Sequence, residues 1–149
     1  MVQLHQRALA KLNLTFMRKA TIDDLDNVLM LLWRNIDKIA IGEPDYDKVA
    51  IHIRELIEDS SSIIMVNDEI TAAGAARLHE CDLGCGLISY GLWLVSERPR
   101  EGLAVGQALI KWSKCNDAIP VASATPKLSN FYSRLGMYQI GRASCRERV

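Results

Sequence analysis

The feature that most constrains the fold is a strand, loop, helix and strand succession in the second half of the chain. Residues 87–95 are largely apolar, which is typical of a strand buried on both faces. A loop containing Gly102 follows, and apolar spacing then predicts a helix over residues 104–114 and a strand over 121–124. This βαβ succession requires a sheet that is at least partly parallel.

The rest of the chain adds helices and a hairpin to this unit. Thr21 and Asp24 have the spacing of a capping box at a helix start, and the turn at residues 67–69 joins two strands of a hairpin. The remaining expected elements are strands at 14–19, 63–66 and 70–78, helices at 22–36, 45–58 and 127–135, and a strand that begins at Met137. This order predicts an α/β domain with a mixed, mostly antiparallel central sheet flanked by helices.

The domain organisation is predicted to be simple. The 149 residues fit one domain, with residues 1–13 as an N-terminal extension and 14–138 as the folded unit. Residues 140–149 back-translate to a widely used sequencing-library adapter, which also covers part of the codon of Gln139. We therefore interpret 139–149 as a non-native tail rather than a natural basic tail. The last strand is then expected to be truncated or replaced, since a sheet edge accepts a compatible backbone.

Charge and hydropathy exclude several classes. The 18 basic and 18 acidic residues cancel, which argues against a general electrostatic grip on nucleic acid or on an anionic membrane. The sequence contains no run of about 18 apolar residues that would predict a membrane span. The first 14 residues lack the apolar core of a secretory signal. We therefore expect a cytoplasmic protein with its cysteines as thiols; the oligomeric state is not readable.

Small residues mark a candidate anion site in the segment EGLAVGQ, residues 101–107. Such residues let backbone amides approach a ligand, and a helix N-terminus adds unpaired N–H groups and a positive dipole end. The segment predicts a phosphate or pyrophosphate site, to which Arg98 and Arg100 could add charge. The alternative is a connector whose small residues only allow a helix to pack.

Four segments, in order, are similar to motifs of the GNAT acetyltransferases. EGLAVGQ resembles the loop of their motif A, with Glu101 where the family has Arg or Gln and Ala104 where it has Gly. RKATIDDL (18–25), NDEITAAG (67–74) and NFYSRLGM (130–137) resemble the first strand and helix, the hairpin and the late signature. The resemblance covers residues 16–138. It implies the GNAT fold and transfer of an acetyl group from acetyl-CoA to an amine of a small molecule or protein.

The resemblance also implies site residues. The strand before the loop would pair with the pantetheine arm and polarise the thioester carbonyl, and the loop amides would hold the pyrophosphate. The implied cofactor-binding residues are Leu94, Val95, Gly102, Leu103, Ala104, Val105, Gly106 and Gln107. Tyr132 falls on the family tyrosine that protonates the leaving thiolate; the alternative is an aromatic ring that packs on the last helix.

Other chemistry stays open at the level of sequence. No general base is assigned: the strand at 87–95 offers only Ser89 and Tyr90, while Glu80, Asp82 and Glu97 could act through water. The acids Glu43, Asp45 and Asp47 either attract a cationic amine acceptor or simply favour a helix start. The ligand spacing of His79, Cys81 and Cys85 does not match a zinc site, so no metal is expected. A non-catalytic GNAT-shaped binding module and a different acyl donor are the alternatives to acetyl transfer.

Overall fold

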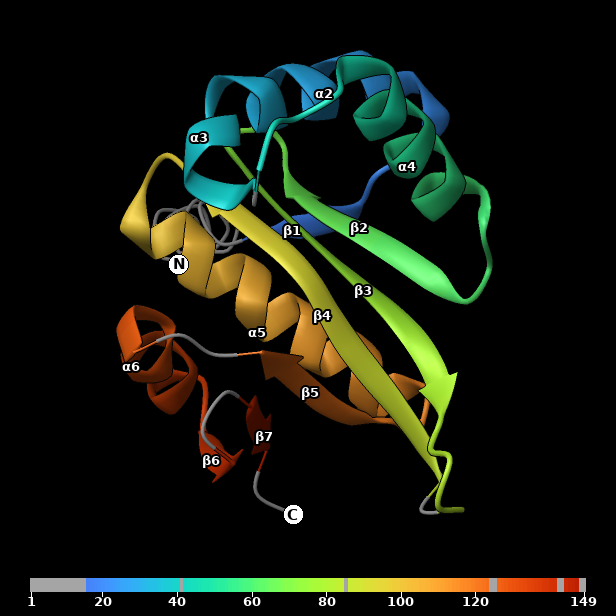
Figure 1. The fold of residues 1–149 in the computed structure, drawn as a ribbon, viewed down its shortest axis with the longest axis vertical. Helices are drawn as coiled ribbons and strands as arrows, with labels where there is room; N and C mark the ends of the chain where they lie inside the picture. Colours follow the sequence, from blue (N-terminus) through green and yellow to red (C-terminus); the bar gives the residue numbers. More distant parts are fainter. Residues whose placement is uncertain (1–15, 41, 85, 124–125, 142–143, 148–149) are drawn as a thin grey trace, which may run out of the picture.

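The fold is described by a computed structural model, shown in Figure 1. It describes residues 16–40, 42–84, 86–123, 126–141 and 144–147. The N-terminal extension, residues 1–13, therefore lies outside the described residues. Within these ranges, no helix combines the length and the apolar character needed to cross a membrane.

The elements follow the expected order closely. They are β1 (Met17–Lys19), the 3-10 helix η1 (Ile22–Asp24), α2 (Leu25–Arg34), α3 (Ile36–Ile39), α4 (Tyr46–Glu58), β2 (Ser62–Asn67), β3 (Ala72–Glu80), β4 (Leu87–Ser96), α5 (Pro99–Cys115), β5 (Ile119–Ser123), α6 (Pro126–Arg134), β6 (Met137–Gly141) and β7 (Ser144–Glu147). The single helix expected over 22–36 is divided into η1, α2 and α3. Asn35, between α2 and α3, donates its side-chain amide to the carbonyl of Leu31 at 2.9 Å.

The described strands form one sheet in the order β1-β2-β3-β4-β5-β7-β6. Only β4 and β5 run parallel, and the other neighbouring pairs are antiparallel. Helices α2, α3 and α4 lie on one side of the sheet and α5 crosses the other (Figure 1). The prediction of a mixed, mostly antiparallel sheet flanked by helices is confirmed.

Backbone of the predicted tail takes part in this sheet. β7 lies between β5 and β6, with Ala122 opposite Cys145 on one side and Gln139 opposite Cys145 on the other. The sheet positions beyond β5 are thus filled by strands that include the tail, because the edge that β5 would otherwise expose accepts a compatible backbone. That the tail is non-native stays a prediction.

Two apolar layers hold the sheet between its helices. One forms between the sheet and α2 and α4, with Val28, Leu31, Ile53, Leu56, Ile64 and Val66 fully buried. The other forms between the sheet and α5, around Ile63, Met65, Ala72, Ala76 and Val105. Ile22 and Tyr46, which the spacing places inward, are instead exposed, because each lies at the very start of its helical segment.

The start of the first helical segment is fixed by a charge pair. Arg18 donates to both carboxylate oxygens of Asp24, at 2.7 and 2.9 Å, and the backbone N–H of Thr21 donates to the same carboxylate at 2.8 Å. The hydrogen bond from Arg18, supported by Thr21 and opposed by burial, lowers the pKa of Asp24 to about 2. The predicted capping box is confirmed.

A close approach sets the distance between α5 and the sheet. A Cβ atom on Gly74, in β3, would lie 2.7 Å from Cγ1 of Val105 and 2.9 Å from Cδ1 of Leu109. Those distances are shorter than real carbon contacts, so only glycine allows this packing. Glycine in this strand thus admits the close approach of a neighbouring helix.

Candidate functional site

The candidate site begins where β4 and β5 part. Their parallel pairing runs from Ile88 opposite Ile119 to Gly91 opposite Ala122, whereas β4 continues to Ser96 and pairs there with β3 alone. Residues 92–96 therefore have one edge that no described strand pairs with. The predicted cofactor-binding residues Leu94 and Val95 lie in this segment.

A β-bulge lies at the point of parting. Ala75 and Ala76 of β3 are opposite Trp93 and Gly91, so Leu92 is an extra residue in β4. Leu92 and Trp93 consequently both pack toward the α2–α4 side of the sheet. Bulges bend a strand and re-aim its side chains, and this one turns β4 away from β5.

Helix α5 begins earlier than the sequence predicts. We expected a loop up to residue 103, but the helix starts at Pro99, and the N–H of Gly102 already donates to the carbonyl of Arg98 at 3.2 Å. Proline is favoured in a first helical turn, which explains the earlier start. Amides from Gly102 onward therefore satisfy helix carbonyls, and those of Arg100 and Glu101 lack acceptors within the helix.

The small residues of this segment are buried in helix packing. A Cβ on Gly102 would lie 3.0 Å from Cβ of Ser96, and one on Gly106 would lie 2.7 Å from Cδ1 of Leu135. Ala104 and Val105 are buried as well, whereas Leu103 is half-buried and Gln107 exposed. The packing alternative thus accounts for both glycines; a role of residues 102–107 toward a cofactor stays a prediction.

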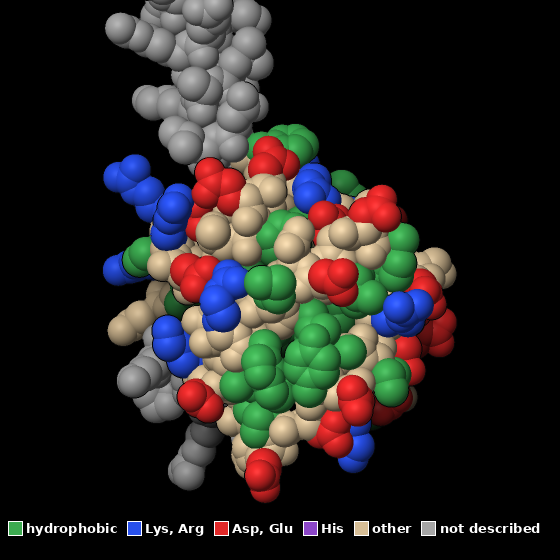
Figure 2. Space-filling view, turned by 90° about the horizontal axis from the view of Figure 1, so that it is seen from above, with side chains coloured by type: hydrophobic (Ala, Val, Ile, Leu, Met, Phe, Trp, Pro, Cys, Tyr) green, Lys and Arg blue, Asp and Glu red, His purple; other side chains and the backbone are tan. Residues whose placement is uncertain are grey.

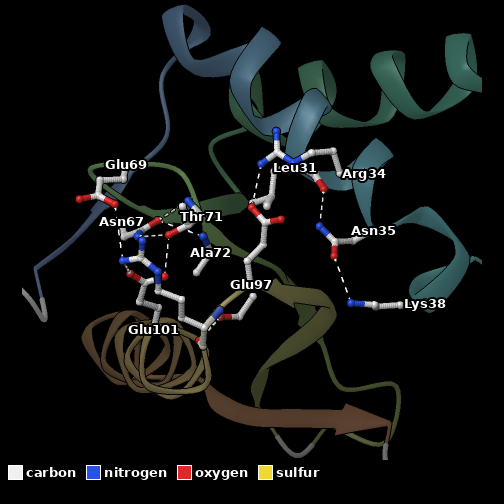
Figure 3. A network of polar contacts seen from close by, with 12 residues as sticks. Leu31, Arg34, Asn35, Lys38, Asn67, Glu69, Thr71, Ala72, Glu97 and Glu101 are labelled. Carbon is white, nitrogen blue, oxygen red and sulfur yellow. Dashed lines mark hydrogen bonds and ion pairs between the residues drawn. The ribbon is translucent and has the colours of Figure 1, made fainter.

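The carboxylate of Glu101 is held by the turn between β2 and β3 (Figure 3). It accepts a hydrogen bond of 2.6 Å from the hydroxyl of Thr71 and one of 3.3 Å from Arg98. Asn67 fixes Thr71 in turn, since its side-chain oxygen accepts from the backbone N–H of Thr71 at 2.9 Å. Arg98 also lies 3.7 Å from Glu69. Glu101 is therefore neutralised locally and tied to the hairpin turn.

Glu97 joins the end of β4 to α2. Its carboxylate accepts a 2.8 Å hydrogen bond from Arg34 (Figure 3). That bond is the main cause that lowers the pKa of Glu97. A carboxylate stabilised in its charged form is a weak base, so Glu97 is a poor candidate for deprotonating an amine.

Tyr132 lies half-buried on α6. Its ring packs beside Phe131 with centroids 5.6 Å apart, and against a small cluster around Ala122 and Met137. The packing alternative is therefore part of what the residue does. Its role as an acid stays a prediction.

Strand alternation places Tyr90 and Arg77 together on the α2–α4 side of the sheet. Ala73 and Ala75 pack on that side and Ala72 and Ala76 on the other, so Arg77 belongs to the first. Tyr90 is directly opposite Arg77, and its hydroxyl is hydrogen-bonded to Ser123 of β5. Ser89 is buried and faces the α5 side by the same alternation, which leaves Tyr90 as the polar side chain of β4 beside the parting.

His52 of α4 completes this group and was not singled out by the sequence. Its Nε2 accepts a 3.2 Å hydrogen bond from the indole N–H of Trp93. Burial, and secondarily the charge of Arg77, lower the pKa of His52. Trp93 is half-buried and orients this imidazole through that hydrogen bond. The only sequence signal was an arginine directly after the small residues 72–76 of β3.

The acidic residues around the start of α4 serve mainly to cap that helix. Asp45 accepts from the backbone N–H groups of Asp47 and Lys48 at 3.0 and 3.2 Å. The neighbouring Tyr46 ring stands edge-on to Trp33 with centroids 5.0 Å apart. Apolar side chains gather on this outer helical face, with acidic side chains around them (Figure 2); the large exposed ones in α2 and α4 are Met30, Trp33, Tyr46 and Ile51.

The described residues hold no group of three or more potential metal ligands. Cys81, expected as a thiol, is disulfide-bonded, so it presents no thiolate. Cys115, whose place in the apolar pattern predicts a buried thiol at a helix end, is instead a free, exposed cysteine at the end of α5, so the predicted burial is wrong.

Comparison with known proteins identifies the architecture. No family model matches the sequence, and no curated protein matches it. A predicted acetyltransferase from Clostridium acetobutylicum, crystallised with acetyl-CoA, has a TM-score of 0.67 at 16% identity over 85% of this chain and 90% of that one. An integron cassette protein from a salt-marsh metagenome has a TM-score of 0.70 at 19% identity over 85% of each chain.

An aminoglycoside acetyltransferase from a soil metagenomic sample, solved in complex with trehalose, also matches. Its TM-score is 0.60 at 13% identity, over 80% of this chain and 86% of that one. At these identities the likeness concerns the fold. Together with the parted strands and α5 behind them, it establishes that this chain has the fold of the GNAT acetyltransferases.

Proposed function

We propose that this chain transfers an acetyl group from acetyl-CoA to an amine of a small molecule or protein. The observation that carries the proposal is the parting of β4 and β5 immediately after Gly91 and Ala122. An exposed strand edge binds an extended chain through backbone hydrogen bonds. Residues 92–96 offer such an edge to the amide-containing arm of the cofactor.

The N-terminus of α5 fits the anionic end of the same molecule. The backbone N–H groups of Arg100 and Glu101 have no helix acceptor, and the helix dipole favours an anion there. Arg100 is exposed, and among the described residues it forms no ion pair. Glu101, the anion that would oppose binding, is engaged by Thr71 and Arg98. The residues present therefore fit a diphosphate.

The chemistry requires three contributions from the chain. A backbone N–H of residues 92–96 would donate to the oxygen that becomes negative when the amine attacks the thioester carbonyl. Tyr132 would give a proton to the departing sulfur. Because Glu97 is a weak base, the amine would lose its proton to water or to a group near Tyr90 on the α2–α4 side of the sheet.

A second candidate function is a GNAT-shaped module that binds a partner without turnover. It is favoured by the start of α5 at Pro99, which leaves few amides for a diphosphate. Thermal unfolding in millimolar acetyl-CoA separates the two, because a ligand of the native state raises the melting temperature. Release of free thiol with a panel of amines then tests transfer. If acetyl-CoA does not raise the melting temperature and no thiol is released with any amine, the enzyme is refuted and the binding module is favoured.

A further inference from the structure

Arg77 stands out among the polar groups of the molecule. Of all buried side-chain nitrogen and oxygen atoms in the described residues, its Nε alone has no hydrogen-bond partner. None of the ion pairs of the described residues includes Arg77. A buried guanidinium nitrogen without an acceptor is costly to a fold, so such a group points to a ligand that supplies the acceptor.

The position of Arg77 relates this ligand to the proposed reaction. Arg77 is opposite Tyr90, and Tyr90 is the residue before Gly91, where β4 and β5 part. Neighbouring strands are about 5 Å apart. The backbones of Arg77 and Tyr90 are therefore about one strand spacing apart, and a small molecule held by the Arg77 side chain can reach the parting of the strands.

The charges around Arg77 suit a single negative charge. Burial, and secondarily the charge of Arg77, lower the pKa of His52 and so favour its neutral form, whereas Glu55 of α4, whose charge acts in the opposite direction, is exposed. His79, two residues along β3 on the same face, is exposed to solvent. Among the described residues near it, Arg77 thus supplies the one half-buried positive charge, which a carboxylate balances, whereas a phosphate dianion would leave a charge uncompensated. Guanidinium also matches a carboxylate in planar, bidentate geometry.

We propose that Arg77 binds the carboxylate of the acceptor, so that the acceptors are small molecules that carry an amine and a carboxylate close together, as α-amino acids do. This inference rests on the proposed acetyl transfer and specifies its substrate class. The carboxylate takes no part in bond making; it positions the amine beside the parting of β4 and β5. The half-buried Leu92 and Val121 lie next to this position and would contact the acceptor side chain.

The test compares matched probes and matched variants. The probes are L-leucine, L-glutamine and L-phenylalanine. Each is compared with its own α-carboxamide, which keeps the amine and removes the carboxylate. The variants are Arg77→Met and, as a control, Arg54→Met, because Arg54 is exposed on α4. Binding is measured by calorimetry without acetyl-CoA, and kcat/KM by thiol release with acetyl-CoA.

We expect at least one acid to bind about tenfold or more tightly than its amide, the scale of a hydrogen bond to a charged group. The preference should vanish in Arg77→Met, persist in Arg54→Met, and reappear in kcat/KM. Arg77→Met without ligand should melt at or above the parent temperature, since it removes an unsatisfied buried group. A clear fall in its melting temperature would assign Arg77 a structural role and overturn the proposal.

The two proposals fail in distinguishable ways. Thiol release with amines but no acid preference, or a preference that Arg77→Met leaves intact, overturns the carboxylate site and leaves acetyl transfer standing. Arg77-dependent binding of acids without any thiol release supports the site and refutes the transfer. Absence of both overturns both proposals.

Discussion

From the ion pair between Arg18 and Asp24 we predict how the free energy of unfolding depends on pH. The pKa of Asp24 is about 2 in the folded chain against an ordinary 3.8. At 1.36 kcal/mol for each pH unit, this difference corresponds to about 2 kcal/mol. Because the Arg18 side chain is 33% exposed, solvent screening reduces the expected contribution to between about 1 and 2 kcal/mol.

The sign follows from the direction of the change. A carboxylate whose pKa is lower in the folded than in the unfolded chain stabilises the fold above the unfolded pKa. The contribution is therefore fully present above about pH 5 and is lost as the pH falls through 3.8 toward about 2. Asp24 is protonated in both states below that range.

The variant Arg18→Gln tests this directly. We expect its free energy of unfolding to fall by about 1–2 kcal/mol at pH 7 and the gap to the parent to close by about pH 2. Urea titrations at several pH values measure the free energy of unfolding of both proteins. The difference between variant and parent cancels the contributions of groups that titrate in the same way in the two. Arg54→Gln, an exposed change, is the control. A gap that stays constant with pH would refute the electrostatic account and indicate lost packing.

Three further predictions concern the site. Gly74→Ala should lower the free energy of unfolding by about 1–3 kcal/mol, the range for overpacking, because the new Cβ would lie 2.7 Å from Val105; combining it with Val105→Ala should recover part of the loss, and strictly additive losses in urea titrations would contradict the contact. Arg100→Glu should weaken acetyl-CoA binding about tenfold or more in calorimetry through a charge reversal at the helix N-terminus, whereas Lys111→Glu, exposed farther along α5, should change it less than about twofold, since the dipole effect is confined to the first turn; equal effects would argue against a diphosphate at that end. Tyr132→Phe should lower kcat about a hundredfold or more with little change in the KM for acetyl-CoA or in melting temperature, as expected for a lost acid whose ring packing is kept; unchanged kcat would remove Tyr132 from the mechanism.

Sequence patterns predicted most of the scaffold because its signals are local. The capping box at Thr21, the hairpin turn at 67–69 and the apolar spacing of α4 each depend on neighbours within a few residues. The predicted start of α5 was wrong because small residues such as Gly102, considered without their spatial neighbours, indicate a loop. Gly102 packs against Ser96 at the end of the preceding strand, and Gly106 packs against Leu135, which is distant in sequence; neither contact follows from the apolar spacing of the helix.

The group of Tyr90, Arg77 and His52 on the α2–α4 side of the sheet could not be predicted, for a different reason. Which side of a sheet a strand residue faces follows from a period of two, and the extra residue Leu92 interrupts that period in β4. Without the bulge, Tyr90 and Trp93 would face opposite sides. The grouping of Tyr90, Arg77 and His52 depends on this single register shift, and Gly91, directly before Leu92, is compatible with a bulge but does not specify one.

The glycine contacts of α5 have a consequence for how a protein of this shape can diversify. At Gly74, Gly102 and Gly106 even one methyl group meets a neighbour at 3.0 Å or less, so the wall behind the parted strands admits almost no variation. The half-buried positions in front, such as Leu92 and Val121, keep some exposed surface toward which a different side chain can extend. Selection, in nature or in a mutant library, can therefore reshape one wall while the other remains fixed.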